Sequence, residues 1–195
     1  MNHRENIASS DAIAVLRAET AYLHAQLDQN LPLGRPDATL ADYAFHLEAL
    51  RDWQLAITPW LARALLHTEP VALMEQDLAD CPERHESSSF VPDIDMQALR
   101  DADDGSDAFC WGMVYVLEGS RLGGKALYRR LHKKLAPHPL RYLRYSEVGG
   151  ASWPETLAFL RSHLDDAGKQ ASAVSGAITA FTLLGKRFGP TSGLQ

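Results

Sequence analysis

The chain has 195 residues, of which 46% are hydrophobic and 23% are charged, and its formal net charge at pH 7 is -6. This length and composition predict one domain that buries a substantial core. The negative charge argues against a nucleic-acid-binding protein whose whole surface is basic. We therefore expect a single domain over residues 1–195, with loose termini at residues 1–9 and 189–195.

Membrane and redox signals are both weak in this sequence. No apolar run approaches the roughly 20 residues that a membrane-spanning helix needs, and residues 1–15 lack the apolar core of a signal peptide. Cys81 and Cys110 form neither a CxxC pair nor a Cys/His metal spacing, which indicates reduced thiols. These features predict a cytoplasmic protein with no membrane partner and no nucleic-acid partner.

The N-terminal part of the sequence predicts two long helices. Apolar residues recur there at helical spacing, and no stretch keeps the period of a strand. The first helix is expected to begin near Ser10, which can cap it, and to end before residues 31–34. Thr39 and Asp42 form a capping box that opens the second helix, and Pro59 either kinks or divides that helix.

The middle of the chain predicts a short helix, a loop and a long apolar helix. The short helix covers residues 72–79, and residues 82–92 are expected to form an exposed loop because they are rich in serine and charge. Ser106 can cap a long helix over residues 107–135, and Pro137 lies just beyond its end.

Two further helices complete the predicted fold. Ser152 and Glu155 form a second capping box, which opens a helix ending near Asp166. The last helix is expected over residues 170–188. Because helices dominate throughout, the sequence predicts an all-α protein, a compact bundle of six to eight helices.

Glycines interrupt the long helix predicted over residues 107–135. Each interior helical glycine costs about 1 kcal/mol relative to alanine, so their number calls for a compensating role. Gly119 and Gly123 are four residues apart and share one face, where a planar ligand could lie against the backbone. A close helix–helix crossing also explains small residues at this spacing, and the motif alone favours this second explanation.

His24 is a candidate metal ligand on the first helix. A lone histidine beside a buried stripe is more often a hydrogen-bonded core residue than a ligand. Asp28, one turn later on the same face, could accept a hydrogen bond from Nδ1 and leave Nε2 free for a metal. Arg17 lies two turns before His24 on that face, about 10 Å along the helix axis.

Other common sites do not match the sequence. It has no Glu-x-x-His pair for a di-iron site, no His-Glu-x-x-His zinc motif, no GxSxG elbow and no GxxxxGK[ST] loop. A basic segment over residues 125–144 is either a solvated helix face or a docking surface for an acidic electron-transfer partner. Its cations are Lys125, Arg129, Arg130, Lys133, Lys134, Arg141 and Arg144.

Two motifs of this sequence resemble haem oxygenases, in particular the bacterial branch associated with bacteriophytochromes. Residues 16–24, LRAETAYLH, are similar to the proximal-helix motif of that family, and residues 115–124, YVLEGSRLGG, are similar to its distal helix. Weaker similarity at residues 75–78 and 179–181 follows the order of the family. The resemblance therefore covers most of the chain and implies a haem sandwiched between a proximal helix and a glycine-rich distal helix.

The resemblance also implies roles for individual residues. His24 would be the axial ligand of the haem iron, with Asp28 as its hydrogen-bond partner. Mammalian-type members carry an aspartate after the first distal glycine, where this chain has Ser120, so the distal water network would be organised differently. Gly119, Ser120 and Gly123 would serve the oxygen chemistry, and the haem-binding set would comprise Arg17, Thr20, Asp28, Tyr115, Gly119, Gly123, Gly124, Arg161 and Phe181.

The implied activity is the oxidative cleavage of haem to biliverdin, CO and ferrous iron, with haem as both cofactor and substrate. It requires O2 and reducing equivalents from an external donor such as a ferredoxin or a flavin reductase, and a bacteriophytochrome could accept the biliverdin. One alternative is a haem-trafficking protein that keeps His24 but cannot organise oxygen, because Ser120 replaces the acid of other family members. A thiamine-salvage enzyme of a related helical fold and a purely structural helical protein are further alternatives.

Overall fold

A computed structural model describes residues 11–64, 71–82, 92–148 and 153–188, with the backbone alone for residues 92–95. These residues form eight α-helices and one 3₁₀ turn, and none of them belongs to a strand. The predicted all-α class is therefore confirmed. The predicted loose termini lie outside the described residues.

In chain order the elements are α1 Ala12–Asn30, η1 Pro32–Gly34, α2 Leu40–Arg63, α3 Val71–Ala79, α4 Pro92–Ala102, α5 Asp107–Leu131, α6 Arg141–Val148, α7 Trp153–His163 and α8 Ala167–Phe188.

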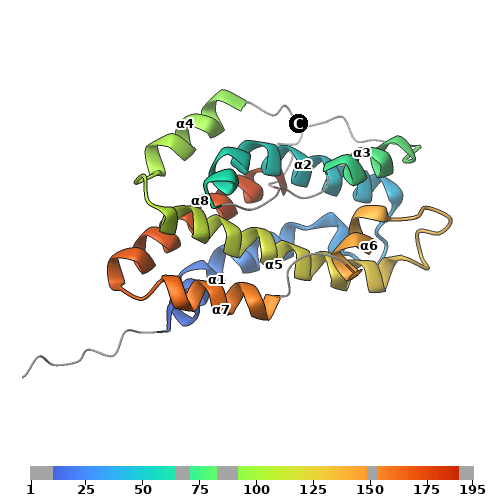
Figure 1. Ribbon diagram of the computed structural model, residues 1–195. Coiled ribbons are helices and arrows are strands. Elements are labelled where there is room, and N and C mark those ends of the chain that lie inside the picture. The colour runs from blue at the N-terminus through green and yellow to red at the C-terminus, as the bar shows by residue number, and fades with distance from the viewer. Residues whose placement is uncertain (1–10, 65–70, 83–91, 149–152, 189–195) are drawn as a thin grey trace, which may run out of the picture.

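These helices pack around a central pair, α5 and α8, as Figure 1 shows. α5 makes its most extensive contact with α8, and α8 also lies along α1. α2 packs against both α5 and α8, while α6 and α7 flank α5.

Two glycines allow the α5 and α8 backbones to touch. A Cβ added at Gly112 would overlap the carbonyl oxygen of Ala173, and one added at Gly176 would overlap that of Phe109. Only glycine fits where two helix backbones approach this closely. The close helix crossing considered for Gly119 and Gly123 thus occurs at Gly112 of the same helix instead.

Side chains cap the helix starts much as the local patterns predict. The Thr39 hydroxyl accepts from the Asp42 N–H, and Asp42 accepts from the Thr39 N–H, which completes the predicted capping box of α2. The Ser106 hydroxyl caps α5. Asp11, and not Ser10, caps α1 by accepting from the Ile13 N–H at 3.1 Å. Ser10 lies outside the described residues, as does Ser152.

Some boundaries differ from the prediction. α2 continues past Pro59 to Arg63, because Ile57, Trp60 and Leu61 remain buried on its inner face. α5 ends at Leu131, four residues earlier than expected. Neither α4 nor α6 was expected as a helix, and residues 83–91 of the predicted loop lie outside the described part of the chain.

The start of α6 depends on a residue from α3. The Asp77 carboxylate is fully buried and accepts hydrogen bonds from the Tyr142 backbone N–H at 2.9 Å and the Tyr43 hydroxyl at 2.7 Å. Arg141 forms an ion pair with Asp77 at 3.0 Å. This buried carboxylate therefore joins α2, α3 and α6, which positions the α6 side chains beneath α5.

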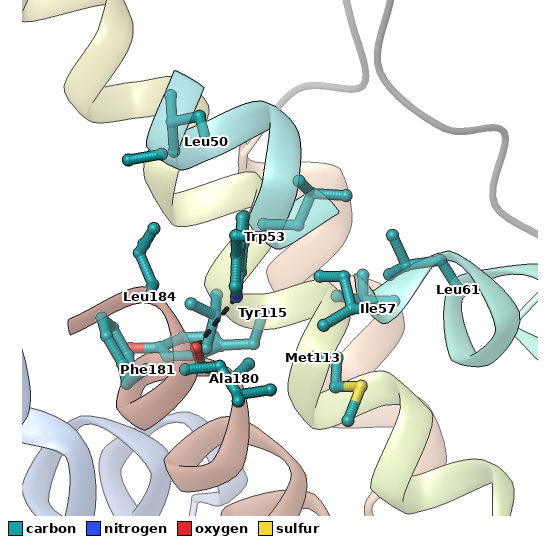
Figure 2. Packing of buried hydrophobic residues seen from close by; sticks show 14 of the residues in the cluster. Leu50, Trp53, Ile57, Leu61, Met113, Tyr115, Ala180, Phe181 and Leu184 are labelled. Atoms are coloured by element: carbon teal, nitrogen blue, oxygen red, sulfur yellow. Dashed lines mark hydrogen bonds between the residues drawn. The ribbon is translucent and has the colours of Figure 1, made fainter. Parts of the chain in front are cut away.

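The core lies between α2, α5 and α8, as the packing in Figure 2 shows. The Trp53 indole is fully buried and donates a hydrogen bond to the Ala180 carbonyl at 3.0 Å. Leu50, Phe181 and Leu184 pack beside it. Within the described residues, no helix is both long and apolar enough to cross a membrane.

Candidate functional site

A largely apolar cavity lies between α1 and α5, and we call it the α1–α5 cavity. It encloses about 930 Å³ of space, part of which is open to solvent. Eight residues of the predicted site line it together: His24, Asp28, Tyr115, Gly119, Ser120, Gly123, Gly124 and Phe181.

His24 and Asp28 meet as their spacing predicts. His24 Nδ1 lies 3.0 Å from Asp28 Oδ2, and both side chains are more than half exposed, at 61% and 64%. The Phe181 ring meets the His24 ring edge-on, with centroids 5.9 Å apart. Because Asp28 engages Nδ1, Nε2 is the nitrogen available to bind a metal.

Gly119 and Gly123 present bare backbone to the cavity. A Cβ added at Gly123 would meet no atom within 4 Å, and one at Gly119 would meet only the Trp153 ring, at 3.9 Å. Helix packing therefore does not require glycine at either position. The open strip that these two residues form is the feature expected for a flat ligand.

Gly124 and Ser120 behave differently from that strip. A Cβ added at Gly124 would lie 2.9 Å from Ser146 Oγ, so Gly124 allows α6 to approach α5. The Ser120 hydroxyl donates to the Leu117 carbonyl at 2.6 Å, within its own helix. The Ser120 proton is thus committed to the helix backbone, although its oxygen can still accept a hydrogen bond.

Tyr115 and Phe181 form part of the apolar wall. Both are buried, and Figure 2 shows them beside Leu184 in the core. The Tyr115 ring lies against Trp153 of α7, with centroids 5.5 Å apart. Trp153 could not be predicted from the sequence, because its place in the cavity depends on how α7 packs on α5.

His46 and Tyr142 also line the cavity, and neither was predicted from the sequence. Burial lowers the pKa of His46 to about 4, and no described residue forms a hydrogen bond with its Nδ1. The Tyr142 hydroxyl accepts from Gln54 Nε2 at 3.4 Å, and burial raises the pKa of Tyr142 to about 12. The local signal that could have identified His46 is the occurrence of a histidine on the buried face of α2.

Arg17, Thr20 and Arg161 are not among the residues that line the cavity. Arg161 forms an ion pair with Asp11 at 3.2 Å. The hydrogen bond from the Ile13 N–H, the contact with Arg161 and the charge of Arg17 lower the pKa of Asp11. The Thr20 hydroxyl donates to the Leu16 carbonyl at 2.7 Å. The two arginines therefore gather at the N-terminal end of α1, and their contact with a ligand stays a prediction.

Several cations of the predicted basic segment hold the fold together. Arg130 donates to the Leu33 and Gly34 carbonyls, and Lys134 donates to the Pro36 carbonyl. Further ion pairs join Arg129 to Glu147 and Arg141 to Asp77 and Asp80. Lys133 and Arg144 remain exposed at the surface.

The cysteines show no sign of activation. Both are buried thiols that form no disulfide, and burial raises the pKa of Cys110 to about 11. Cys81 Sγ lies 3.8 Å from His138 Nε2, but that nitrogen is also 3.1 Å from the Asp77 carbonyl, and His138 Nδ1 accepts from the Leu140 N–H. His138 Nε2 must then carry the proton, so it cannot deprotonate Cys81.

Part of the chain is similar to a heme oxygenase. The relative is a protein of Xanthomonas campestris, with 38% identity over 78 residues, which are 39% of this chain and 47% of the relative. The matched stretch thus spans about half the length of that curated relative. No model of a known protein family matches the chain. The similarity supports a relationship to haem oxygenases and agrees with the all-α fold.

Proposed function

We propose that the chain is a haem oxygenase that binds haem in the α1–α5 cavity, where His24 Nε2 would hold the iron. One observation carries the proposal: a single cavity combines His24, whose Nδ1 is held by Asp28, with the open Gly119–Gly123 strip of α5. A protein that binds a flat metal complex needs a fixed ligand on one helix and free space on the other. The partial similarity to a heme oxygenase supports the same function.

The residues present fit a haem in three respects. An imidazole whose Nδ1–H is engaged by a carboxylate is the form that offers Nε2 to iron. The missing side chains at Gly119 and Gly123 leave room for the ring to approach the α5 backbone. The wall around them is mainly apolar and aromatic, with Tyr115 and Phe181 buried in it, as a porphyrin requires.

The proposed reaction would convert haem, with O2 and electrons from an external donor, to biliverdin, CO, ferrous iron and water. Bound haem would supply both the iron and the ring that is oxidised, so the protein would mainly position and shield it. A neutral His24 would hold the iron without the strong electron donation of a thiolate, the kind of ligand that favours O–O cleavage. The backbone at Gly119 and Gly123 sets how closely the ring approaches α5, and Phe181 and Trp153 restrict water and ring movement.

The remaining members of the predicted haem-binding set have supporting roles in this proposal. Arg17 and Arg161 are candidate partners of the haem propionates, and ligand binding would have to draw Arg161 away from Asp11. Thr20 lies on the helix that carries His24, and its hydroxyl donates to the Leu16 carbonyl there. Ser120 can accept a hydrogen bond from an ordered water, since its own proton is given to Leu117.

The proposed reaction needs an external electron donor such as a ferredoxin or a flavin reductase. Lys133 and Arg144 are exposed near the cavity-forming helices and could attract an acidic donor, whose association would weaken as salt increases. A bacteriophytochrome as acceptor of the biliverdin follows from the resemblance to the associated bacterial branch.

A non-catalytic haem carrier is the second candidate, and Ser120 favours it. Because its hydroxyl proton is donated within α5, this residue does not supply the hydrogen-bond donor that an oxidising site could use. A carrier would bind haem through His24 and leave the ring intact.

A hemin titration followed by reduction in air separates these functions. We expect a saturable Soret band of a histidine-ligated haem, and its decay to extractable biliverdin once a reductase is added. The His24→Ala variant should lose that spectrum. A band that persists with a competent reductase would indicate the carrier, and the absence of any saturable band would contradict both.

A further inference from the structure

His46 is a buried polar residue in the wall of the α1–α5 cavity. It lies on the inner face of α2 and is only 6% exposed, yet it is one of the cavity-lining residues. Its Nδ1 is completely buried and has no hydrogen-bond partner among the described residues. Buried polar atoms almost always have such a partner, so an unpartnered one in a binding cavity calls for a physical reason.

The surroundings of His46 are aromatic and apolar. Its ring lies against Phe188 with centroids 5.5 Å apart and the planes inclined by 30°, and Phe45 contacts the same ring of Phe188 edge-on. Burial alone lowers the pKa of His46, and no charged neighbour contributes. The imidazole is therefore neutral at pH 7, with one N–H donor and one acceptor nitrogen.

Packing alone does not explain a histidine at this position. A phenylalanine or leucine could fill the space beside Phe188 without burying an unpaired nitrogen, and a buried polar group without a partner destabilises the folded protein. The unpartnered nitrogen acquires a purpose if a ligand in the cavity supplies the missing partner.

Two other polar groups of the cavity are already engaged within the protein. His24 Nδ1 is engaged by Asp28, and the Ser120 hydroxyl donates to Leu117. Of the described residues that line the cavity, none is an arginine or a lysine. A ligand oxygen that reaches the α2 wall would therefore meet a neutral donor there, and not a cation.

We propose that His46 donates a hydrogen bond from its imidazole to an oxygen atom that enters the cavity with haem. This inference rests on the proposed haem-binding function. It adds a hydrogen-bond contact from α2 to the iron contact that His24 would make from α1. The oxygen belongs either to a haem carboxylate or to a small ligand on the iron. Both are hydrogen-bond acceptors, and the experiment distinguishes them.

The test compares hemin binding and apo-protein stability in three variants. His46→Leu removes the donor, His46→Asn keeps an N–H group near the position of Nδ1, and Ile57→Leu is a volume-conserving control on the buried face of α2 outside the cavity. We expect His46→Leu to bind hemin about tenfold more weakly, the factor that corresponds to about 1.4 kcal/mol for one hydrogen bond. His46→Asn should recover most of that affinity, and Ile57→Leu should bind as the unaltered protein does.

Stability separates a ligand contact from a structural role. If His46 serves the ligand, the apo form of His46→Leu should melt at the same temperature as the unaltered protein or higher, because an unpaired buried nitrogen has been removed. A lower melting temperature with unchanged hemin affinity would show a structural role and overturn the inference. If His46→Leu does not fold, other variants test the donor. Hemin affinities of His46→Asn and His46→Gln that equal that of the unaltered protein would support a hydrogen-bond donor at this position. An equally high hemin affinity of His46→Phe would overturn the inference.

Two further measurements identify the oxygen. If the tenfold difference between the unaltered protein and His46→Leu disappears with hemin whose carboxylates are esterified, the acceptor is a carboxylate. If the C–O stretching frequency of the ferrous CO complex shifts in His46→Leu, the acceptor is the iron-bound ligand. Unchanged affinity and frequency in His46→Leu would refute the His46 contact while haem binding stands, whereas an unaltered protein that binds no hemin would refute the proposed function as well.

Discussion

The glycines of α5 divide into two regions with opposite requirements. At the crossing with α8, a Cβ at Gly112 would overlap another backbone, and Gly176 on α8 faces the same constraint in return. At the α1–α5 cavity, a Cβ at Gly123 would meet nothing within 4 Å. The first region needs glycine in order to fold, whereas the second gains nothing for folding from a missing side chain.

This difference shows that glycines of one helix can serve two purposes, close helix packing and an open surface for a ligand. Close packing requires glycine at Gly112, which faces α8, and favours it at Gly124, which faces Ser146 of α6. The open strip is confined to Gly119 and Gly123. A helical glycine with free space around it lowers stability by about 1 kcal/mol relative to alanine, so helix packing gives no reason for glycine at position 123.

The largest expected effect is at the crossing. Gly176→Ala should reduce the free energy of unfolding by more than about 3 kcal/mol, because the new methyl group would overlap the Phe109 carbonyl and force α5 and α8 apart. Urea unfolding of the apo-protein measures this, with Gly185→Ala on the same helix as control, since a Cβ there meets nothing within 4 Å. A loss under 1 kcal/mol for Gly176→Ala would mean that the helices are not in backbone contact.

The next largest expected effect is a loss of stability at acidic pH. The folded-state pKa of His46 is about 4 and its usual value is 6.5, so between these pH values the unfolded chain binds the proton more strongly. The free energy of unfolding of the apo-protein should therefore fall as pH decreases from 6.5 to 4, with up to about 3 kcal/mol of the loss due to this one residue. The decline should be correspondingly shallower in His46→Leu. An identical pH profile for both proteins would show that His46 titrates normally.

The sequence predicts well those features that residues close in the chain decide. The Thr39–Asp42 capping box, the Ser106 cap and the His24–Asp28 pair each join residues no more than four positions apart, and all three form. The all-α class follows for the same reason, because helical periodicity is local.

Features that depend on distant residues could not be predicted in this way. The start of α6 is held by Asp77, 65 positions before Tyr142, and the environment of His46 is completed by Phe188 from the end of α8. The haem-binding role that the resemblance implies for Arg161 stays a prediction, and the sequence did not reveal its partner in the structure, Asp11, 150 positions away. The tertiary fold decides these partners.

A smaller effect tests the α1 side of the cavity. Asp28→Ala should weaken hemin binding about tenfold, since losing the partner of a metal-binding histidine typically lowers affinity tenfold or more. The stability of the apo-protein should change by less than about 0.5 kcal/mol, because the His24–Asp28 pair is exposed. Asp165→Ala, which breaks an exposed pair with Lys169, is the matched control and should leave hemin binding unchanged. Equal hemin affinity of Asp28→Ala and the unaltered protein would remove Asp28 from the site.

The smallest stability effect sharpens the comparison most, because its sign should be reversed. Gly123→Ala should leave the apo-protein as stable as before, or more stable by about 0.5 to 1 kcal/mol, since alanine favours a helix and the new methyl group has free space. The same methyl group would stand between α5 and a flat ligand, so hemin binding or ring cleavage should decrease. A protein that gains stability and still binds and cleaves hemin normally would show that the open strip is not the ligand surface. A protein that gains stability and loses either property would show that α5 keeps glycine at this position for the ligand, as it keeps Gly112 for α8.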